Sequence, residues 1–152
     1  QLYMNIERYQ EGLTTQLLDL LLMADPDRMA ITVYLEGSTI YVARDLNVLI
    51  GVAVITHEKE YVELKNLAVK ESHQQSGVAK ELIATAKSYA RESGATCIQV
   101  GTGNSSLSQL ALYQKCGFRM QSIKQDYFAD YPEPIIENGI RCLDRVVLSA
   151  SL

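Results

Sequence analysis

A short glycine-containing segment precedes the most regular helical pattern in this chain of 152 residues. The segment consists of Gln74, Gln75, Ser76, Gly77, Val78, Ala79 and Lys80. The first backbone N–H groups of a helix lack intrahelical acceptors, and together with the helix dipole they bind phosphate. Gly77 has no Cβ to block the approach of an anion, and Lys80 adds a positive charge. The segment therefore predicts a phosphate-binding loop, with a simple turn into the helix as the alternative.

Three further residues have side chains suited to group transfer. Tyr113 lies in a helical pattern and can donate a proton to a leaving group, and packing of its ring against a sheet is the alternative. Asn104 precedes that pattern, where it can cap the helix, orient a ligand amide, or do both. Glu63 lies in a strand pattern, and its carboxylate either accepts a proton from an amine or is solvated or ion-paired. An amine with a pKa of about 10.4 is only about four parts in 10⁴ neutral at pH 7, so its attack on a carbonyl needs a base or an ordered water chain.

The elements expected to position these residues alternate between strands and helices. Helical patterns cover residues 14–24, 78–92 and 105–116, and strand patterns cover residues 39–45, 48–57, 61–69, 96–100, 118–127 and 140–148. The helix at 78–92 joins two strands by a crossover, which requires a parallel pair, whereas the first three strands form an antiparallel meander. We therefore expect an α+β fold, a mixed sheet that is mostly antiparallel with one parallel pair and is flanked by helices, in a single domain over residues 1–152.

Composition and charge exclude several classes of function. The formal net charge is −4, from 14 basic and 18 acidic side chains, so nothing favours binding to a nucleic-acid backbone. The apolar run near residues 20–24 is far shorter than the ~20 residues that span a bilayer. The cysteines are odd in number and widely spaced, which favours neither disulfides nor a zinc site. We expect a cytoplasmic protein without a metal, a membrane segment or a secretion signal.

The order of strand, glycine loop, helix, strand and second helix resembles the GNAT superfamily of acetyl-CoA-dependent N-acetyltransferases. The resemblance covers about residues 30–149 and is most specific over 61–119. Gln74 and Ala79 stand at the first and last positions of the family's loop pattern, Q/R-x-x-G-x-G/A. The resemblance implies a GNAT-like fold with acetyl-CoA as cosubstrate.

The resemblance also implies where the coenzyme lies. The strand that ends at Val69 would separate from the strand at 96–100, with the pantetheine arm between them, and the pyrophosphate would lie on the amides of residues 75–80. Asn104 and Tyr113 match the family's second motif. The implied coenzyme-binding residues are Leu67, Ala68, Val69, Gln74, Gln75, Ser76, Gly77, Val78, Ala79, Lys80 and Asn104.

By the same resemblance, the expected reaction is direct acetyl transfer to a primary amine in a ternary complex. Tyr113 would assist departure of the thiolate, and Glu63, at a position where several family members carry a catalytic glutamate, or a water chain would accept the amine proton. The alternative is a regulatory module that binds acetyl-CoA without useful catalysis. The sequence does not identify the acceptor, which is a small molecule or a peptide, although the runs 101–106 and 137–142 are similar to a bacterial subgroup. A homodimer is left open.

Overall fold

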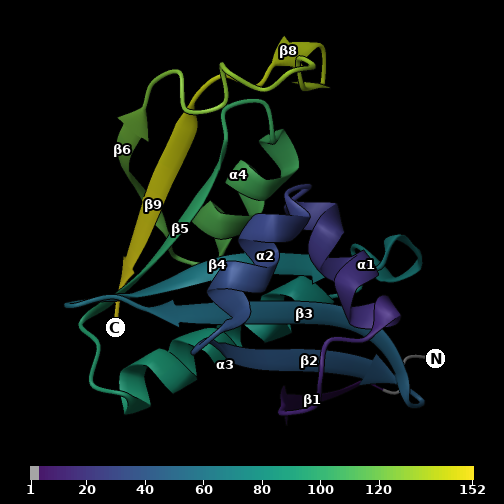
Figure 1. Ribbon diagram of the computed structural model, residues 1–152. Coiled ribbons are helices and arrows are strands. Elements are labelled where there is room, and N and C mark those ends of the chain that lie inside the picture. Colours follow the sequence, from purple (N-terminus) through teal and green to yellow (C-terminus); the bar gives the residue numbers. More distant parts are fainter. Residues whose placement is uncertain (1–3) are drawn as a thin grey trace.

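The computed structural model describes residues 4–152, and its centre is a seven-stranded sheet with the order β1-β2-β3-β4-β5-β9-β6 (Figure 1). The strands of this sheet are β1 (Met4–Tyr9), β2 (Thr39–Asp45), β3 (Val48–His57), β4 (Val62–Val69), β5 (Cys97–Gly103), β6 (Arg119–Lys124) and β9 (Arg145–Ser151). Neighbouring strands are antiparallel, except that β4 and β5 are parallel. A separate two-stranded hairpin consists of β7 (Ile136–Glu137) and β8 (Ile140–Arg141).

Helices cover both faces of the sheet (Figure 1). They are α1 (Thr15–Ala24), α2 (Arg28–Leu35), α3 (Val78–Glu92) and α4 (Leu107–Lys115), with a short 3₁₀ helix at Glu71–His73. On one face, α1 and α2 bury a cluster that includes Leu17, Leu21, Ile31, Val42, Val52, Val54 and Ala68. On the other face, α3 buries the main core, which includes Ile55, Leu64, Val78, Leu82, Ile83, Ala86, Ile98, Val100 and Leu148.

An irregularity in β4 separates this strand from β5. Leu64 pairs with Ile55 of β3, but Asn66 pairs with Val54, so Lys65 is an extra residue that bulges from the ladder. The parallel pairing with β5 covers only residues 62–64 of β4. Beyond Leu64, the edge of β4 that faces β5 has no strand partner among the described residues. The splayed pair expected from the sequence is therefore present.

Most of the predicted elements are confirmed. The helix at 78–92 has the predicted bounds, and Gly94 follows it with a φ of 87°, in the left-handed region where glycine is favoured. Thr14 caps α1, because its hydroxyl accepts a hydrogen bond from the Leu17 N–H at 3.2 Å. The hairpin of β2 and β3 and the parallel pair of β4 and β5 are also as expected.

The prediction of one strand over 140–148 was wrong, and two elements were missed. The chain leaves β8 at Arg141 and enters β9 only at Arg145, because residues 142–144 turn to meet the end of β5. The missed elements are β1 and α2. The apolar, partly β-branched composition of α2 does not indicate a helix; the Asp27 carboxylate, which accepts a hydrogen bond from the Ala30 N–H at 3.1 Å, and the buried Ile31 stabilise it.

Two findings concern metals and membranes. Within residues 4–152, no helix is long and apolar enough to span a membrane. Over the same residues, no group of three or more histidine, cysteine or carboxylate side chains is arranged to hold a metal ion.

Candidate functional site

The loop before α3 is built to accept an anion. Gln75 has a φ of 63° and Gly77 a φ of 89°, whereas Ser76 between them has no positive φ. Backbone that alternates in handedness directs N–H groups into a concavity that binds anions. Among the described residues, none accepts a hydrogen bond from the backbone N–H groups of 75–80. These six groups lie at the positive end of the α3 dipole.

A groove of about 620 Å³ joins this loop to the open edge of β4 and to one side of α4. Its walls consist of Leu67, Val69, His73, Gln74, Gln75, Gly77, Ala79, Lys80, Ser108, Gln109, Ala111, Leu112 and Lys115. The groove therefore brings together seven of the eleven predicted coenzyme-binding residues. Because the groove extends from the loop to the open edge of β4, a ligand bound along it would place one end at the unpaired N–H groups.

The other predicted coenzyme-binding residues do not line the groove. The side chains of Ala68 and Val78 are buried in the two apolar clusters. The Ser76 hydroxyl donates a hydrogen bond to the His73 carbonyl. Backbone N–H groups can serve a ligand even where the side chain packs elsewhere, so at these positions the predicted role would fall to the main chain and stays a prediction.

Gln74 braces the loop. Its side-chain amide donates a hydrogen bond to the Val69 carbonyl at 3.0 Å, which ties the start of the loop to the end of β4.

His73 was missed by the sequence analysis. One ring nitrogen, Nε2, lies 2.9 Å from the Asp45 carboxylate, and the other, Nδ1, lies 2.8 Å from the Ser72 hydroxyl. His73 thus connects the loop before α3 to the end of β2. Its place directly before the loop was a signal, but the bond to Asp45 spans 28 residues and has no trace in the local pattern.

The α4 side of the groove was also missed. The groove is lined on this side by Ser108, Gln109, Leu112 and Lys115. The side-chain oxygen of Gln109, Oε1, is buried without a hydrogen-bond partner among the described residues. Residues three or four positions from Tyr113 in a helix lie near it on the helix surface, and this spacing could have pointed to Gln109 from the sequence.

Tyr113 lies in α4 with only 5% of its surface exposed. Its ring packs edge-on against Phe118, with 5.7 Å between the ring centres. Burial, with a smaller contribution from Cys116, raises the pKa of the Tyr113 phenol far above its ordinary value. The phenol accordingly stays protonated across the neutral range. Its hydroxyl makes no hydrogen bond to any residue that the structure describes, but Tyr113 is not among the residues that line the groove, so its role toward a thiolate stays a prediction.

Asn104 does not cap α4, and that part of the prediction was wrong, because Ser106 is the residue before the helix. The side-chain oxygen of Asn104, Oδ1, accepts hydrogen bonds from the N–H groups of Leu143 and Asp144 at 2.9 and 3.0 Å. Its side-chain amide nitrogen, Nδ2, donates one to the Arg141 carbonyl at 3.1 Å. These bonds hold the turn between β8 and β9. Asn104 also lies outside the groove, so the geometry gives no support to its predicted contact with coenzyme.

We therefore expect Asn104→Ala to act on stability. Loss of three hydrogen bonds should lower the free energy of unfolding by about 1–3 kcal/mol, measured by urea denaturation. Asn5→Ala, an exposed position in β1, is the control and should change it by less than about 0.5 kcal/mol. A variant of Asn104 with unchanged stability but weaker coenzyme binding would contradict the structural role.

Glu63 lies on the face of the sheet that α1 and α2 cover, and 14% of its side chain is exposed. One carboxylate oxygen lies 3.4 Å from Lys65 Nζ and 3.6 Å from an Arg145 guanidinium nitrogen. The carboxylate is thus ion-paired, as the structural alternative in the sequence analysis had it. Ion pairing does not exclude proton transfer, since the carboxylate remains partly accessible.

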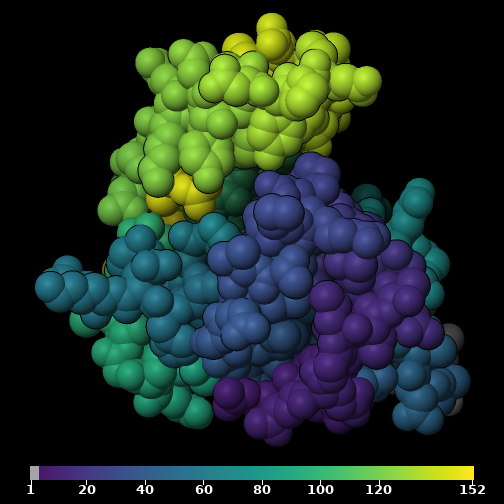
Figure 2. Space-filling view, viewed as in Figure 1, coloured from purple at the N-terminus to yellow at the C-terminus, as the bar shows by residue number. Residues whose placement is uncertain are grey.

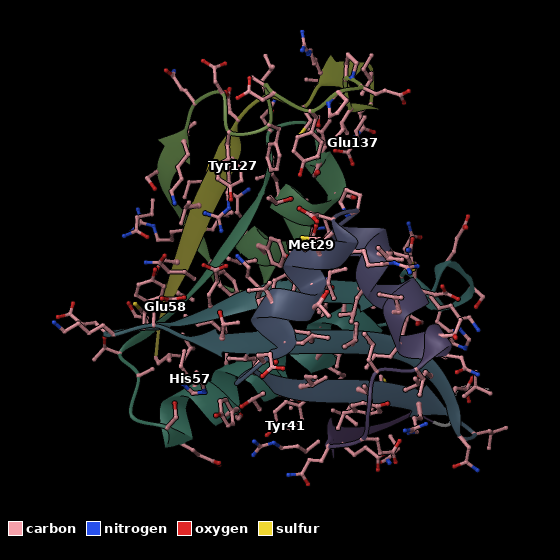
Figure 3. All side chains as sticks on the ribbon, in the orientation of Figure 1. Met29, Tyr41, His57, Glu58, Tyr127 and Glu137 are labelled. Atoms are coloured by element: carbon pink, nitrogen blue, oxygen red, sulfur yellow. The ribbon has the colours of Figure 1, made fainter. Side chains whose placement is uncertain are left out.

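A hollow on this same face separates α2 from the segment 119–143, as Figure 2 shows. Tyr127 and Met29 come from opposite sides of it, and 54% and 78% of their surfaces are exposed (Figure 3). Burial raises the pKa of Tyr131 on one side of the hollow, and Asp25 and Asp27, which precede α2 on the other side, raise it further. The charges of one side therefore act on the other. The groove and the hollow therefore lie on opposite faces of the splayed strands.

Comparisons with known proteins agree with this architecture. The model of the acetyltransferase (GNAT) family matches residues 6–118. The uncharacterized N-acetyltransferase YvbK of Bacillus subtilis (strain 168) is 46% identical over 144 residues, which is 93% of each chain. A crystal structure of a Bacillus subtilis acetyltransferase in complex with CoA has a TM-score of 0.93 at 46% identity and covers 98% of this chain and 99% of its own. A GNAT family acetyltransferase from Elizabethkingia anophelis with acetyl-CoA bound has a TM-score of 0.92 at 38% identity over 98% of each chain. The chain belongs to the GNAT family of acetyltransferases.

Proposed function

We propose that this protein transfers an acetyl group from acetyl-CoA to a primary amine by direct transfer in a ternary complex. The observation that carries the proposal is the set of six unpaired N–H groups at residues 75–80, placed in a groove that continues along the open edge of β4. Relatives at 46% and 38% identity contain CoA or acetyl-CoA. The groove on one face and the hollow on the other give the two substrates separate approaches.

The residues present fit the coenzyme. A pyrophosphate needs converging N–H donors, which the loop supplies, and Lys80 and Lys115 on the groove walls add positive charge. The pantetheine arm carries amide groups, which the unpaired edge of β4 after Leu64 can bind as an additional strand would. When bound, acetyl-CoA supplies an activated acetyl thioester.

Glu63 and Tyr113 carry out the proton transfers. The acceptor ammonium releases one proton to solvent through Glu63, and its neutral nitrogen forms the new bond to the acetyl carbon. As the carbon–sulfur bond breaks, Tyr113 gives its proton to the departing thiolate. The second proton lost by the nitrogen restores Tyr113, so the products are an amide and CoA thiol, with one proton released.

The decisive experiment measures thiol release from acetyl-CoA against a panel of primary amines and peptides. We expect acetyl-CoA to raise the melting temperature and at least one amine to cause thiol release. Stabilisation without release from any acceptor would favour the regulatory module. Absence of both would contradict the proposal.

Glu63→Gln tests the proposed base. We expect kcat/KM for the amine to fall about 100-fold at pH 7, with the loss shrinking toward pH 10, where more of the amine is neutral without help. Measurement of kcat/KM from pH 6 to pH 10 checks this. Glu60→Gln, an exposed carboxylate before the same strand, is the control. A variant profile parallel to that of the wild type would show that water rather than Glu63 takes the proton.

A further inference from the structure

Arg145 lies across β5 in a gap left by a glycine. It begins β9 on the face that α1 and α2 cover, and its guanidinium reaches past Gly101 to Glu63 on β4. A Cβ on Gly101 would lie only 2.2 Å from the guanidinium carbon, so no other residue at 101 leaves room for this arrangement. On its far side the guanidinium contacts the Tyr127 ring, with 5.6 Å to the ring centre.

The guanidinium keeps its donors free. Its approach to Glu63 is 3.6 Å, which is longer than a hydrogen bond, and it donates none to the residues that the structure describes. Arginine carries five N–H donors in a planar fork that matches a carboxylate. With 14% of the side chain exposed, Arg145 is held between Glu63 and Tyr127 but is still accessible.

The charges around Glu63 do not balance. Lys65 and Arg145 both face its single carboxylate, so the groups paired within 4 Å of it carry an excess of one positive charge. Tyr61 lies close to this pair, and its pKa is raised by burial and, less strongly, by Glu58 and Glu63, while Arg145 opposes the shift. An acceptor with only an ammonium group would raise this excess to two, whereas an acceptor that also has one carboxylate would leave it at one and would cancel it once the amine is neutral.

We propose that Arg145 binds the carboxylate of the acceptor and that the acceptor is an α-amino acid. This inference rests on the proposed function, because it assigns the amine to the Glu63 side of the sheet. In an α-amino acid the amine and the carboxylate are attached to one carbon, which matches the short separation of Glu63 from Arg145. The exposed Tyr127 and Met29 in the adjoining hollow offer apolar surface to a side chain (Figure 3).

The test compares three acceptors that share one side chain: phenylalanine, phenylalaninamide and phenethylamine. We expect kcat/KM for phenylalanine to exceed that for each of the others by about 10- to 100-fold, as for a charge-assisted pair. Loss of the carboxylate charge also lowers the pKa of the α-amine, so kcat/KM for each acceptor is calculated per neutral amine. The amide is then the stricter comparison, because it keeps the α-amine and loses the negative charge. The same trio built on leucine repeats the test with an aliphatic side chain.

Two variants locate the effect. Arg145→Met should bring the ratio of phenylalanine to phenylalaninamide close to one while leaving the KM for acetyl-CoA unchanged. Gly101→Ala should do the same by displacing the guanidinium, and it should have no further effect in the Arg145→Met background. Gly12→Ala, which places a Cβ in open space, is the matched control. A purely structural role for Arg145 would reduce all three acceptors equally.

Each outcome decides a specific point. Wild-type enzyme that uses the amide or the decarboxylated amine as well as the amino acid overturns the inference and leaves the proposed function standing. Retention of the preference in Arg145→Met also overturns it. Absence of thiol release from every amine and peptide tested contradicts the proposed function, and the inference falls with it.

Discussion

Gly77→Asp is expected to weaken binding of CoA by about 30-fold, which corresponds to about 2 kcal/mol. The new carboxylate would lie beside the unpaired N–H groups that are proposed to hold the pyrophosphate, and like charges would repel. The residue also has a φ of 89°, which an L side chain adopts with strain, although no heavy atom lies within 4 Å of the new Cβ. Titration calorimetry with CoA measures the change.

Gly94→Asp is the matched control for this prediction. Gly94 has a φ of 87° and equally open surroundings, and it follows the opposite end of the same helix. A negative charge there opposes the helix dipole, so Gly94→Asp should be the less stable variant and yet bind CoA like the wild type. Equal loss of CoA binding in both variants would mean that backbone strain, not charge at the loop, governs the affinity.

Tyr113→Phe is expected to lower kcat by about 100-fold and to leave the affinity for CoA within twofold, because the ring still packs on Phe118. The direction of the pKa shift adds a second expectation. Since burial raises the pKa of Tyr113 above its ordinary value, the proton remains on the phenol throughout the neutral and mildly alkaline range. Ionisation of Tyr113 should therefore produce no alkaline fall in kcat below about pH 10.

Steady-state kinetics with acetyl-CoA and a saturating amine check the Tyr113 prediction. Tyr41→Phe, on the opposite side of the molecule from the hollow, serves as the control and should retain full activity (Figure 3). If Tyr113→Phe kept wild-type kcat, the thiolate would leave without a protein acid, and the buried phenol would be a packing residue.

The fold was predictable where local pattern and tertiary packing agree. The α3 helix has apolar residues at three- and four-residue steps with a glycine after its end, so periodicity alone located it. By contrast, α2 reads like a strand until the Asp27 cap and the burial of Ile31 are known. The break between β8 and β9 depends on hydrogen bonds that Asn104 accepts from residues 39 and 40 positions later in the chain. Such long-range bonds leave no periodicity in the sequence.

The candidate site divides in the same way. The position of the loop before α3 could be predicted because a short run of consecutive residues specifies it, and its phosphate-binding role stays a prediction. Arg145 could not, because its place depends on the missing side chain of Gly101, which is adjacent only in the folded sheet.

The bulge at Lys65 gives β4 two halves with different hydrogen-bonding states. Residues 62–64 are paired on both sides, whereas residues 67–69 are paired with β3 alone. Backbone amides of the second half that face away from β3 should thus exchange with deuterium from solvent quickly, and slow down when a ligand completes the ladder. The hydrogen–deuterium exchange rates along this one strand would report whether a ligand occupies the groove, without any enzymatic turnover.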